Sequence, residues 1–184
     1  MLITSLATIL LLSIPADSRT LRRWTKKVIS WTFTDPYHLL SSEQYDAIRG
    51  IVRGSFDEWG AALEGLVEFV EENEEDADIN VFFAKKNHSC YEAFDGKGGV
   101  VAHSMYPPFG ILHLDGDEEW RTRDKVTRDV DIRQVLIHEI GHTIGLRHSR
   151  QKASVMRKHY ERTDKKHQLS KFDVRAVRKL YGAL

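Results

Sequence analysis

The stretch from His138 to His148 constrains this chain more than any other, because it combines closely spaced histidines with a glycine. His138 and His142 are four residues apart, so on a helix both imidazoles project from one face. Gly145 follows and can adopt a left-handed conformation that turns the chain sharply. Such a turn lets His148 swing back as a third ligand. The sequence therefore predicts a helix, a sharp turn and a metal site made by three histidines.

The ligand types and a neighbouring carboxylate indicate what this metal site does. Three imidazoles suit one zinc ion, and three protein ligands leave the fourth position for water, which is typical of a catalytic zinc. Glu139 adjoins the first histidine and can reach that water. It would take the proton of the water as general base and pass it to the leaving amine, while zinc lowers the pKa of the water and polarises the scissile carbonyl. The alternative is a helix that merely carries surface histidines, but the added glycine and third histidine argue strongly against it.

This segment resembles the metzincin zinc peptidases, and specifically the matrixins, the catalytic domain of the matrix metalloproteinases. Ser149, directly after the third histidine, is similar to the matrixin form. Met156 stands where metzincins carry the methionine of a turn beneath the zinc, although core packing alone would also explain a methionine there. The resemblance runs from about Trp24 to Gly182. It also includes Phe94-Asp95-Gly96, Ala102-His103, His113-Leu114-Asp115, Asp117-Glu118 and Leu180-Tyr181-Gly182.

Hydrophobic periodicity predicts the secondary structure. We expect strands at Ile29 to Phe33, Val67 to Val70, Ile79 to Phe83, Val100 to Met105 and Ile111 to Leu114. We expect a helix that begins after the capping box of Ser41 and Gln44 and ends at Gly60, a second helix over Val130 to Leu146, and a third that Ser170 caps and Gly182 ends.

This order of elements indicates an α/β (α+β) fold, with one sheet packed on a helical lower part. The resemblance implies a metzincin-like architecture: a twisted, mostly parallel five-stranded sheet with an antiparallel edge strand, three helices, and an active-site cleft between the upper and lower parts.

A second group of metal-binding residue types precedes the catalytic helix. It consists of His88, Cys90, His103 and His113, of which the last two fall within predicted strands. Matrixins hold a structural zinc here with three histidines and one aspartate, and Cys90 occupies the aspartate position. A thiolate and three imidazoles make a good closed zinc site, so we expect a structural zinc. The alternative is a free Cys90 and an empty site.

A loop rich in glycine resembles the matrixin calcium loop. Its residues are Asp95, Gly96, Gly98 and Val100, closed by Asp115 and Glu118. Carboxylates together with backbone carbonyls suit a hard cation such as Ca²⁺. The alternative is a turn with solvated acids.

The resemblance also implies how substrate binds. Substrate would lie extended along the edge strand that contains Ala102, paired through its backbone. A side-chain pocket beside the zinc is walled in the family by Met-x-Pro-x-Tyr, which reads Met156-Arg157-Lys158-His159-Tyr160 in this chain. Tyr160 is kept and Lys158 replaces the proline, so the resemblance predicts neither the shape of the pocket nor the residue preferred after the cleaved bond.

Length and composition agree with a small extracellular enzyme. The chain has 184 residues, enough for one domain, and 27 basic and 27 acidic residues give no net charge, which does not favour nucleic-acid binding. A single cysteine excludes an intramolecular disulfide.

Met1 to Ile14 is apolar and small residues follow, so we expect a signal peptide over residues 1–18 and a catalytic domain over 19–184. A membrane anchor or a buried terminal helix is the alternative, although the run is shorter than the roughly 20 residues of a membrane span. We expect neither a propeptide nor a hemopexin-like domain.

The sequence thus predicts a secreted zinc-dependent metalloendopeptidase that hydrolyses extracellular matrix or other extracellular proteins. We expect a monomer without stable membrane association. Two rival hypotheses are a secreted metal-binding or peptide-binding module without turnover, and a protease tethered to the membrane.

Overall fold

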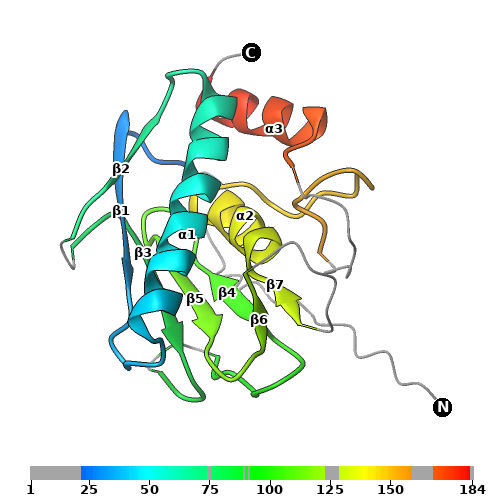
Figure 1. Cartoon of the computed structure of the whole chain (residues 1–184). Coiled ribbons are helices and arrows are strands. Elements are labelled where there is room, and N and C mark those ends of the chain that lie inside the picture. The colour runs from blue at the N-terminus through cyan, green and yellow to red at the C-terminus, as the bar shows by residue number, and fades with distance from the viewer. Residues whose placement is uncertain are drawn as a thin grey trace.

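Five strands form one sheet with the order β2-β1-β3-β5-β4 (Figure 1). The computed structural model describes residues 22–73, 76–88, 90, 92–122, 129–158 and 168–182. Neighbouring strands are parallel except for β4, which pairs antiparallel with β5 at the edge of the sheet. This confirms the predicted mostly parallel sheet with an antiparallel edge strand. The strands are β1 Val28–Thr34, β2 Glu68–Glu71, β3 Ile79–Ala84, β4 Ala102–Ser104 and β5 Ile111–Asp115.

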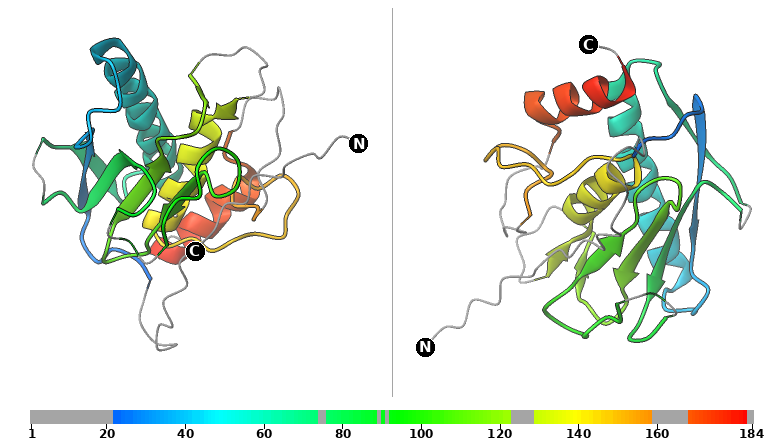
Figure 2. Two further views of the ribbon diagram at one scale, coloured as in Figure 1. Left: turned by 90° about the horizontal axis from the view of Figure 1, so that it is seen from below. Right: turned by 180° about the vertical axis from the view of Figure 1, so that it is seen from behind.

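The described residues form the three predicted helices: α1 Ser42–Leu63, α2 Ile132–Thr143 and α3 Lys171–Tyr181. Figures 1 and 2 show α1 and α2 side by side over one face of the sheet, with α3 beyond them. The indole N–H of Trp59 on α1 donates a hydrogen bond of 3.0 Å to the carbonyl of Ile137 on α2. The guanidinium of Arg178 on α3 donates one of 2.7 Å to the carbonyl of Ala62 on α1. The first bond fixes α2, which carries the histidine motif, against α1, and the second fixes α3 against α1.

Local signals account for most of the helix ends. Ser41 and Gln44 form the predicted capping box at the start of α1. Ser170 forms another with Asp173 at the start of α3, and Gly182 ends that helix in the left-handed region, with φ of 88°.

Three predicted helix boundaries are wrong. The helix α1 does not end at Gly60 but continues to Leu63, because burial of Ala62 and Leu63 outweighs the cost of an interior glycine, which is about 1 kcal/mol. The left-handed residue Glu64 ends it.

The helix α2 is shorter than predicted at both ends. Val130 belongs to the short strand β7 Val130–Asp131, which pairs with β6 Trp120–Arg121, and the Asp131 side chain then caps the helix. At the other end, the helix stops before Gly145.

The core lies between the sheet and the two central helices. Trp31 on β1 stacks on Phe56 of α1, with ring centroids 4.7 Å apart. Phe33 and Phe83 meet edge to face in the same layer and are almost fully buried. Each such side chain contributes about 1.5–3 kcal/mol through burial. The functional side chains described below are therefore attached to a rigid framework.

The expected signal peptide over residues 1–18 lies outside the described residues. Among the helices that the structure describes, none combines the length and the apolar character needed to span a bilayer.

Candidate active site and second metal cluster

The three histidines of the motif come together at the end of α2. The Nε2 atoms of His138 and His142 lie 3.0 Å apart, and both side chains are almost fully buried. The His148 ring lies 5.3 Å from that of His138 and 4.9 Å from that of His142, measured between centroids. One ligand atom of each residue lies within 4.8 Å of the others, close enough for one metal ion.

Gly145 makes the return of His148 possible, as its place in the motif predicts. Its φ is 106°, a conformation that side chains other than hydrogen rarely allow. A β-carbon at this position would also lie 1.7 Å from the carbonyl oxygen of Arg22. The turn therefore requires glycine both for its backbone angle and for the close approach of the N-terminal segment.

Backbone carbonyls fix how two of these imidazoles present their nitrogens. The Nδ1 atom of His138 lies 2.7 Å from the carbonyl of Val155, and that of His142 lies 2.7 Å from the carbonyl of Leu146. A carbonyl only accepts, so each Nδ1 carries the proton and each Nε2 presents a lone pair. Sequence reasoning missed these partners, because main-chain groups leave no residue-type signal.

Burial keeps these two histidines neutral. It lowers the pKa of His138 to about 4, and the carbonyl of Val155 offsets this only in part. Burial, followed by the nearby His138, lowers the pKa of His142 well below its ordinary value. Two neutral Nε2 lone pairs that face each other at 3.0 Å repel unless an electrophile lies between them. The residues therefore fit a zinc ion, whose preferred ligand here is neutral imidazole.

Glu139 is fully buried beside the histidines. Its Oε2 atom accepts a hydrogen bond of 2.5 Å from the hydroxyl of Ser104 on β4. Among the described residues, its Oε1 atom has no hydrogen-bond partner. Burial raises the pKa of Glu139 to about 8, and the bond from Ser104 opposes this. A bound cation favours the carboxylate form, so the arrangement suits a general base next to a metal ion.

Sequence reasoning missed Ser104, although a signal was present. Side chains alternate along a strand, so Ser104 and Ala102 point to the face opposite His103. That face carries α2, and the helix packs against β4.

Met156 packs directly against the middle of the motif. It is 2% exposed, and its Sδ atom lies 2.3 Å from where a β-carbon on Gly141 would be. The carbonyl of Met156 accepts a hydrogen bond of 2.7 Å from the backbone of Ser149, just after the third histidine. Met156 thus contacts the motif at Gly141, between its first two histidines, and directly after its third histidine.

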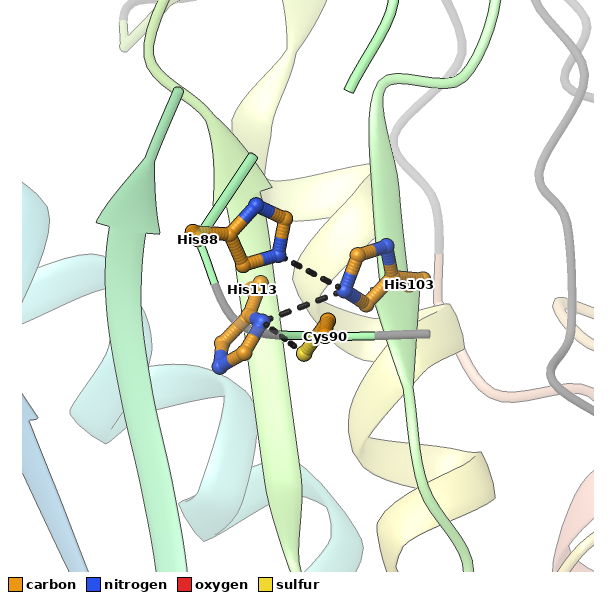
Figure 3. A group of neighbouring side chains, drawn as sticks. All are labelled: His88, Cys90, His103 and His113. Atoms are coloured by element: carbon orange, nitrogen blue, oxygen red, sulfur yellow. Dashed lines mark hydrogen bonds between the residues drawn. The ribbon is translucent and has the colours of Figure 1, made fainter. Parts of the chain in front are cut away.

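The second group of predicted ligands also comes together, on the other face of the sheet. Figure 3 shows the four side chains pointing toward one another. The Nε2 atom of His103 lies 3.2 Å from Nε2 of His88 and 3.1 Å from Nδ1 of His113, and the Cys90 sulfur lies 3.1 Å from the same His113 nitrogen. His103 and His113 are cross-strand partners of β4 and β5, which explains their proximity. All four ligand atoms lie within 4.8 Å of one another.

The protonation states of this cluster also fit a metal ion. Burial, with repulsion from neighbouring histidines, lowers the pKa of His103 to about 4 and that of His113 to about 2. His88 points its Nδ1 at the carbonyl of Lys86, 2.8 Å away, which leaves Nε2 for the cluster. Burial raises the pKa of the Cys90 thiol, so metal binding would have to displace its proton. Three imidazoles and one sulfur make a closed set suited to structural zinc.

Comparison with known proteins decides the family, because the matrixin family model matches residues 23–182, nearly the whole described chain. This chain belongs to the matrixin family. It is 34% identical to Metalloendoproteinase 5-MMP of Arabidopsis thaliana over 169 residues, which is 87% of this chain and 46% of that protein. Karilysin of Tannerella forsythia is 34% identical over 168 residues, 87% of this chain and 33% of its own length. Matrix metalloproteinase-19 of Homo sapiens is 32% identical over 174 residues, 91% of this chain and 33% of its own length.

These relatives support the predicted fold and chemistry. The chain thus contains a matrixin catalytic domain, the zinc metalloendopeptidase unit of the family. It spans less than half the length of each of the three relatives.

The loop that resembles the matrixin calcium loop is held by carboxylates. Asp95 accepts a hydrogen bond of 3.1 Å from the backbone of Val100, and Glu118 accepts one of 2.5 Å from the backbone of Gly98. Asp115 is fully buried, and its Oδ2 atom has no hydrogen-bond partner among the described residues. Burial raises the pKa of Asp115, and hydrogen bonds from the backbone of Asp117 and Gly96 offset this only in part. The structure therefore brings together the predicted acids and the glycine-containing loop, including Gly96, around a buried carboxylate oxygen of Asp115.

Of the two residues predicted to contact substrate, the structure describes only Ala102. Ala102 begins the edge strand β4 and is buried. Tyr160 and its pocket wall lie outside the described residues.

Proposed function

We propose that this matrixin chain is a secreted, zinc-dependent metalloendopeptidase that cleaves peptide bonds in extracellular matrix or other extracellular proteins. The observation that supports it best is the convergence of three histidine nitrogens beside the buried carboxylate of Glu139. His138, His142 and His148 would hold the catalytic zinc. When bound, zinc lowers the pKa of its water and polarises the scissile carbonyl.

In this proposal Glu139 moves the proton. Its carboxylate accepts a proton from the attacking water as the water oxygen bonds to the carbonyl carbon of the substrate. The same carboxyl then delivers the proton to the amide nitrogen as the C–N bond breaks, so that an amine and a carboxylic acid leave. Burial excludes bulk water from Glu139, which strengthens its interaction with charge that develops nearby.

The edge strand β4 would align the substrate. It pairs with β5 on one side only, and its other side is the edge of the sheet. An extended peptide can add to such an edge through backbone hydrogen bonds, which makes recognition largely independent of side chains. The backbone at Ala102 would supply part of this contact, and Tyr160 would form part of the pocket wall beside the zinc.

The other two ion sites would be structural. His88, Cys90, His103 and His113 would hold a second zinc, and their buried, neutral imidazoles support this. The loop of Asp95, Gly96, Gly98 and Val100 with Asp115 and Glu118 would hold Ca²⁺, supported by the buried Oδ2 atom of Asp115, which has no hydrogen-bond partner among the described residues.

The extracellular setting is supported by the apolar Met1 to Ile14 segment and by relatives named matrix metalloproteinases. We propose residues 1–18 as a signal peptide, residues 19–184 as the catalytic domain, and a monomer in solution.

A paired activity and metal assay tests this function. Cleavage of a quenched-fluorescence peptide would be followed for the wild type and for Glu139→Ala, with and without a zinc-binding hydroxamate, and zinc content would be measured on the same samples. We expect the wild type to cleave, the hydroxamate to stop it, and Glu139→Ala to retain zinc without cleavage. The exposed Glu68 on β2 offers a matched control, since Glu68→Ala should cleave like the wild type. Zinc binding by an intact wild type that cuts no peptide would instead favour a binding module without turnover.

A further inference from the structure

Ser104 connects the edge strand of the sheet to the carboxylate of Glu139. Register pairs Ser104 with Leu112 and His103 with His113, so the hydroxyl points away from the second metal cluster and toward α2. There it donates a hydrogen bond of 2.5 Å to Oε2 of Glu139. Both side chains are fully buried, so water does not compete for this bond.

The distance between these two oxygens lies in the range of a charge-assisted bond, which forms when Glu139 is ionised. A hydroxyl that donates to a carboxylate at 2.5–2.7 Å makes a stronger hydrogen bond than two neutral groups do. Ser104 is fixed by its strand pairing, and Glu139 is fixed at its backbone by α2. One oxygen of the carboxylate is therefore held between two rigid elements, while the described residues offer no partner to Oε1.

We propose that Ser104 is a positioning residue that holds Oε2 of Glu139 and thereby reserves Oε1 for the attacking water. The inference rests on the proposed function, in which Glu139 is the general base. Without the hydroxyl, the glutamate side chain could rotate about its three torsions within the buried site. A misplacement of about 1 Å at a reacting group costs about 100-fold in rate, so orientation of this carboxylate is expected to matter.

Steady-state kinetics of Ser104→Ala separate positioning from binding. Because the hydroxyl contacts Glu139 and not the substrate, we expect kcat to fall by about tenfold or more. We expect KM to change by less than about twofold, and zinc content to stay at the wild-type value. The matched control is Ser55→Ala on α1, which removes another buried hydroxyl, bonded to the carbonyl of Ile51, and should leave kcat unchanged. A kcat of Ser104→Ala equal to that of the wild type would overturn the proposal.

A double-mutant cycle in thermal unfolding tests the bond itself without activity. Melting temperatures would be measured for the wild type, Ser104→Ala, Glu139→Ala and the double variant, all at matched zinc content. In Glu139→Ala the hydroxyl of Ser104 is buried without its acceptor, so its removal should cost less than in the wild type. We expect the double variant to melt higher than the sum of the single shifts predicts. Additive shifts would show that the two side chains do not interact and would overturn the inference.

The same samples distinguish this proposal from the proposed function. If Glu139→Ala still cleaves peptide, the role of Glu139 as base is wrong, and the positioning role falls with it. If Glu139→Ala is inactive while Ser104→Ala has the kcat of the wild type, only the positioning role is wrong.

Discussion

The sulfur of Met156 lies against the backbone of Gly141, so close that a β-carbon on this glycine would be 2.3 Å away. Gly141 directly precedes His142 in the motif and lies three residues after His138. The Cζ2 atom of Trp59 would lie 3.1 Å from the same β-carbon. Met156 therefore packs against α2 between its two predicted ligands, and a larger residue at Gly141 would displace the methionine side chain.

Gly141→Ala tests this contact. Alanine favours a helix over glycine by about 1 kcal/mol, but the added methyl group would force buried Met156 and Trp59 to move. Overpacking of this kind costs about 1–3 kcal/mol, so we expect a lower melting temperature and weaker zinc retention. Both are measured on the purified variant by thermal unfolding and elemental analysis.

Gly50→Ala is the matched control for that substitution. Gly50 lies within α1, and a β-carbon there would meet no atom within 4 Å. We expect this change to stabilise the protein by about 0.5–1 kcal/mol, since the helix preference is then unopposed. Equal melting temperatures for the two alanine variants would contradict the packing role of Met156.

Much of the fold could be predicted because its signals are local. The capping boxes at Ser41 and Ser170, the alternation of Ile29, Trp31 and Phe33, and the turn at Gly145 depend on residues near one another in the chain. The wrong predictions are helix boundaries that contacts between distant parts of the chain determine. The helix α1 passes Gly60 because Leu63 is buried, and α2 starts late because Val130 pairs with Trp120.

The residues of the candidate site likewise fall into those that the sequence predicts and those that it does not. The histidine spacing made the His138–His142 pair predictable, and the structure brings together both groups of predicted metal ligands. The carbonyls of Val155 and Leu146 were missed because main-chain groups leave no residue-type signal. The hydroxyl of Ser104 was missed although strand alternation places it on the face opposite His103, because its contact with Glu139 depends on how α2 packs on β4.

Replacement of Cys90 tests the second metal cluster. We expect Cys90→Ala to bind one zinc fewer per chain than the wild type, because three buried imidazoles then lack the fourth ligand. Cys90→Asp restores an anionic ligand and should recover that zinc. Native mass spectrometry counts the zinc ions bound per chain. We also expect the melting temperature to fall in Cys90→Ala and to recover in Cys90→Asp. A wild-type zinc count in Cys90→Ala would exclude the sulfur as a ligand.

The pH dependence of stability depends in part on Glu71. Burial alone would raise its pKa, but hydrogen bonds from Arg49 at 2.5 Å and Arg53 at 2.9 Å outweigh this, so the pKa is lowered in the folded protein. In acid the unfolded chain therefore binds more protons at this residue than the folded one. The stabilisation is present above the ordinary glutamate pKa and is lost as the pH falls through the lowered value.

The substitution Glu71→Gln removes the carboxylate and so tests its contribution to the free energy of unfolding. We expect the variant to be less stable than the wild type by about 1 kcal/mol at pH 7, since the two arginines remain partly exposed. The difference should shrink steadily as the pH is lowered through the carboxyl range, as measured by denaturant unfolding. Glu68→Gln on the same strand is the control, because Glu68 is exposed. A Glu71→Gln difference that does not vary with pH would contradict the ion pair.

Zinc removal and reconstitution test the central claim most directly. The purified wild type would be stripped with a chelator, dialysed, and assayed for peptide cleavage while zinc is added back in the presence of Ca²⁺. If His138, His142 and His148 hold the catalytic ion, cleavage disappears with the metal and returns with zinc, whereas His142→Ala stays inactive throughout. Full cleavage by protein shown to be free of metal would contradict a zinc-dependent peptidase.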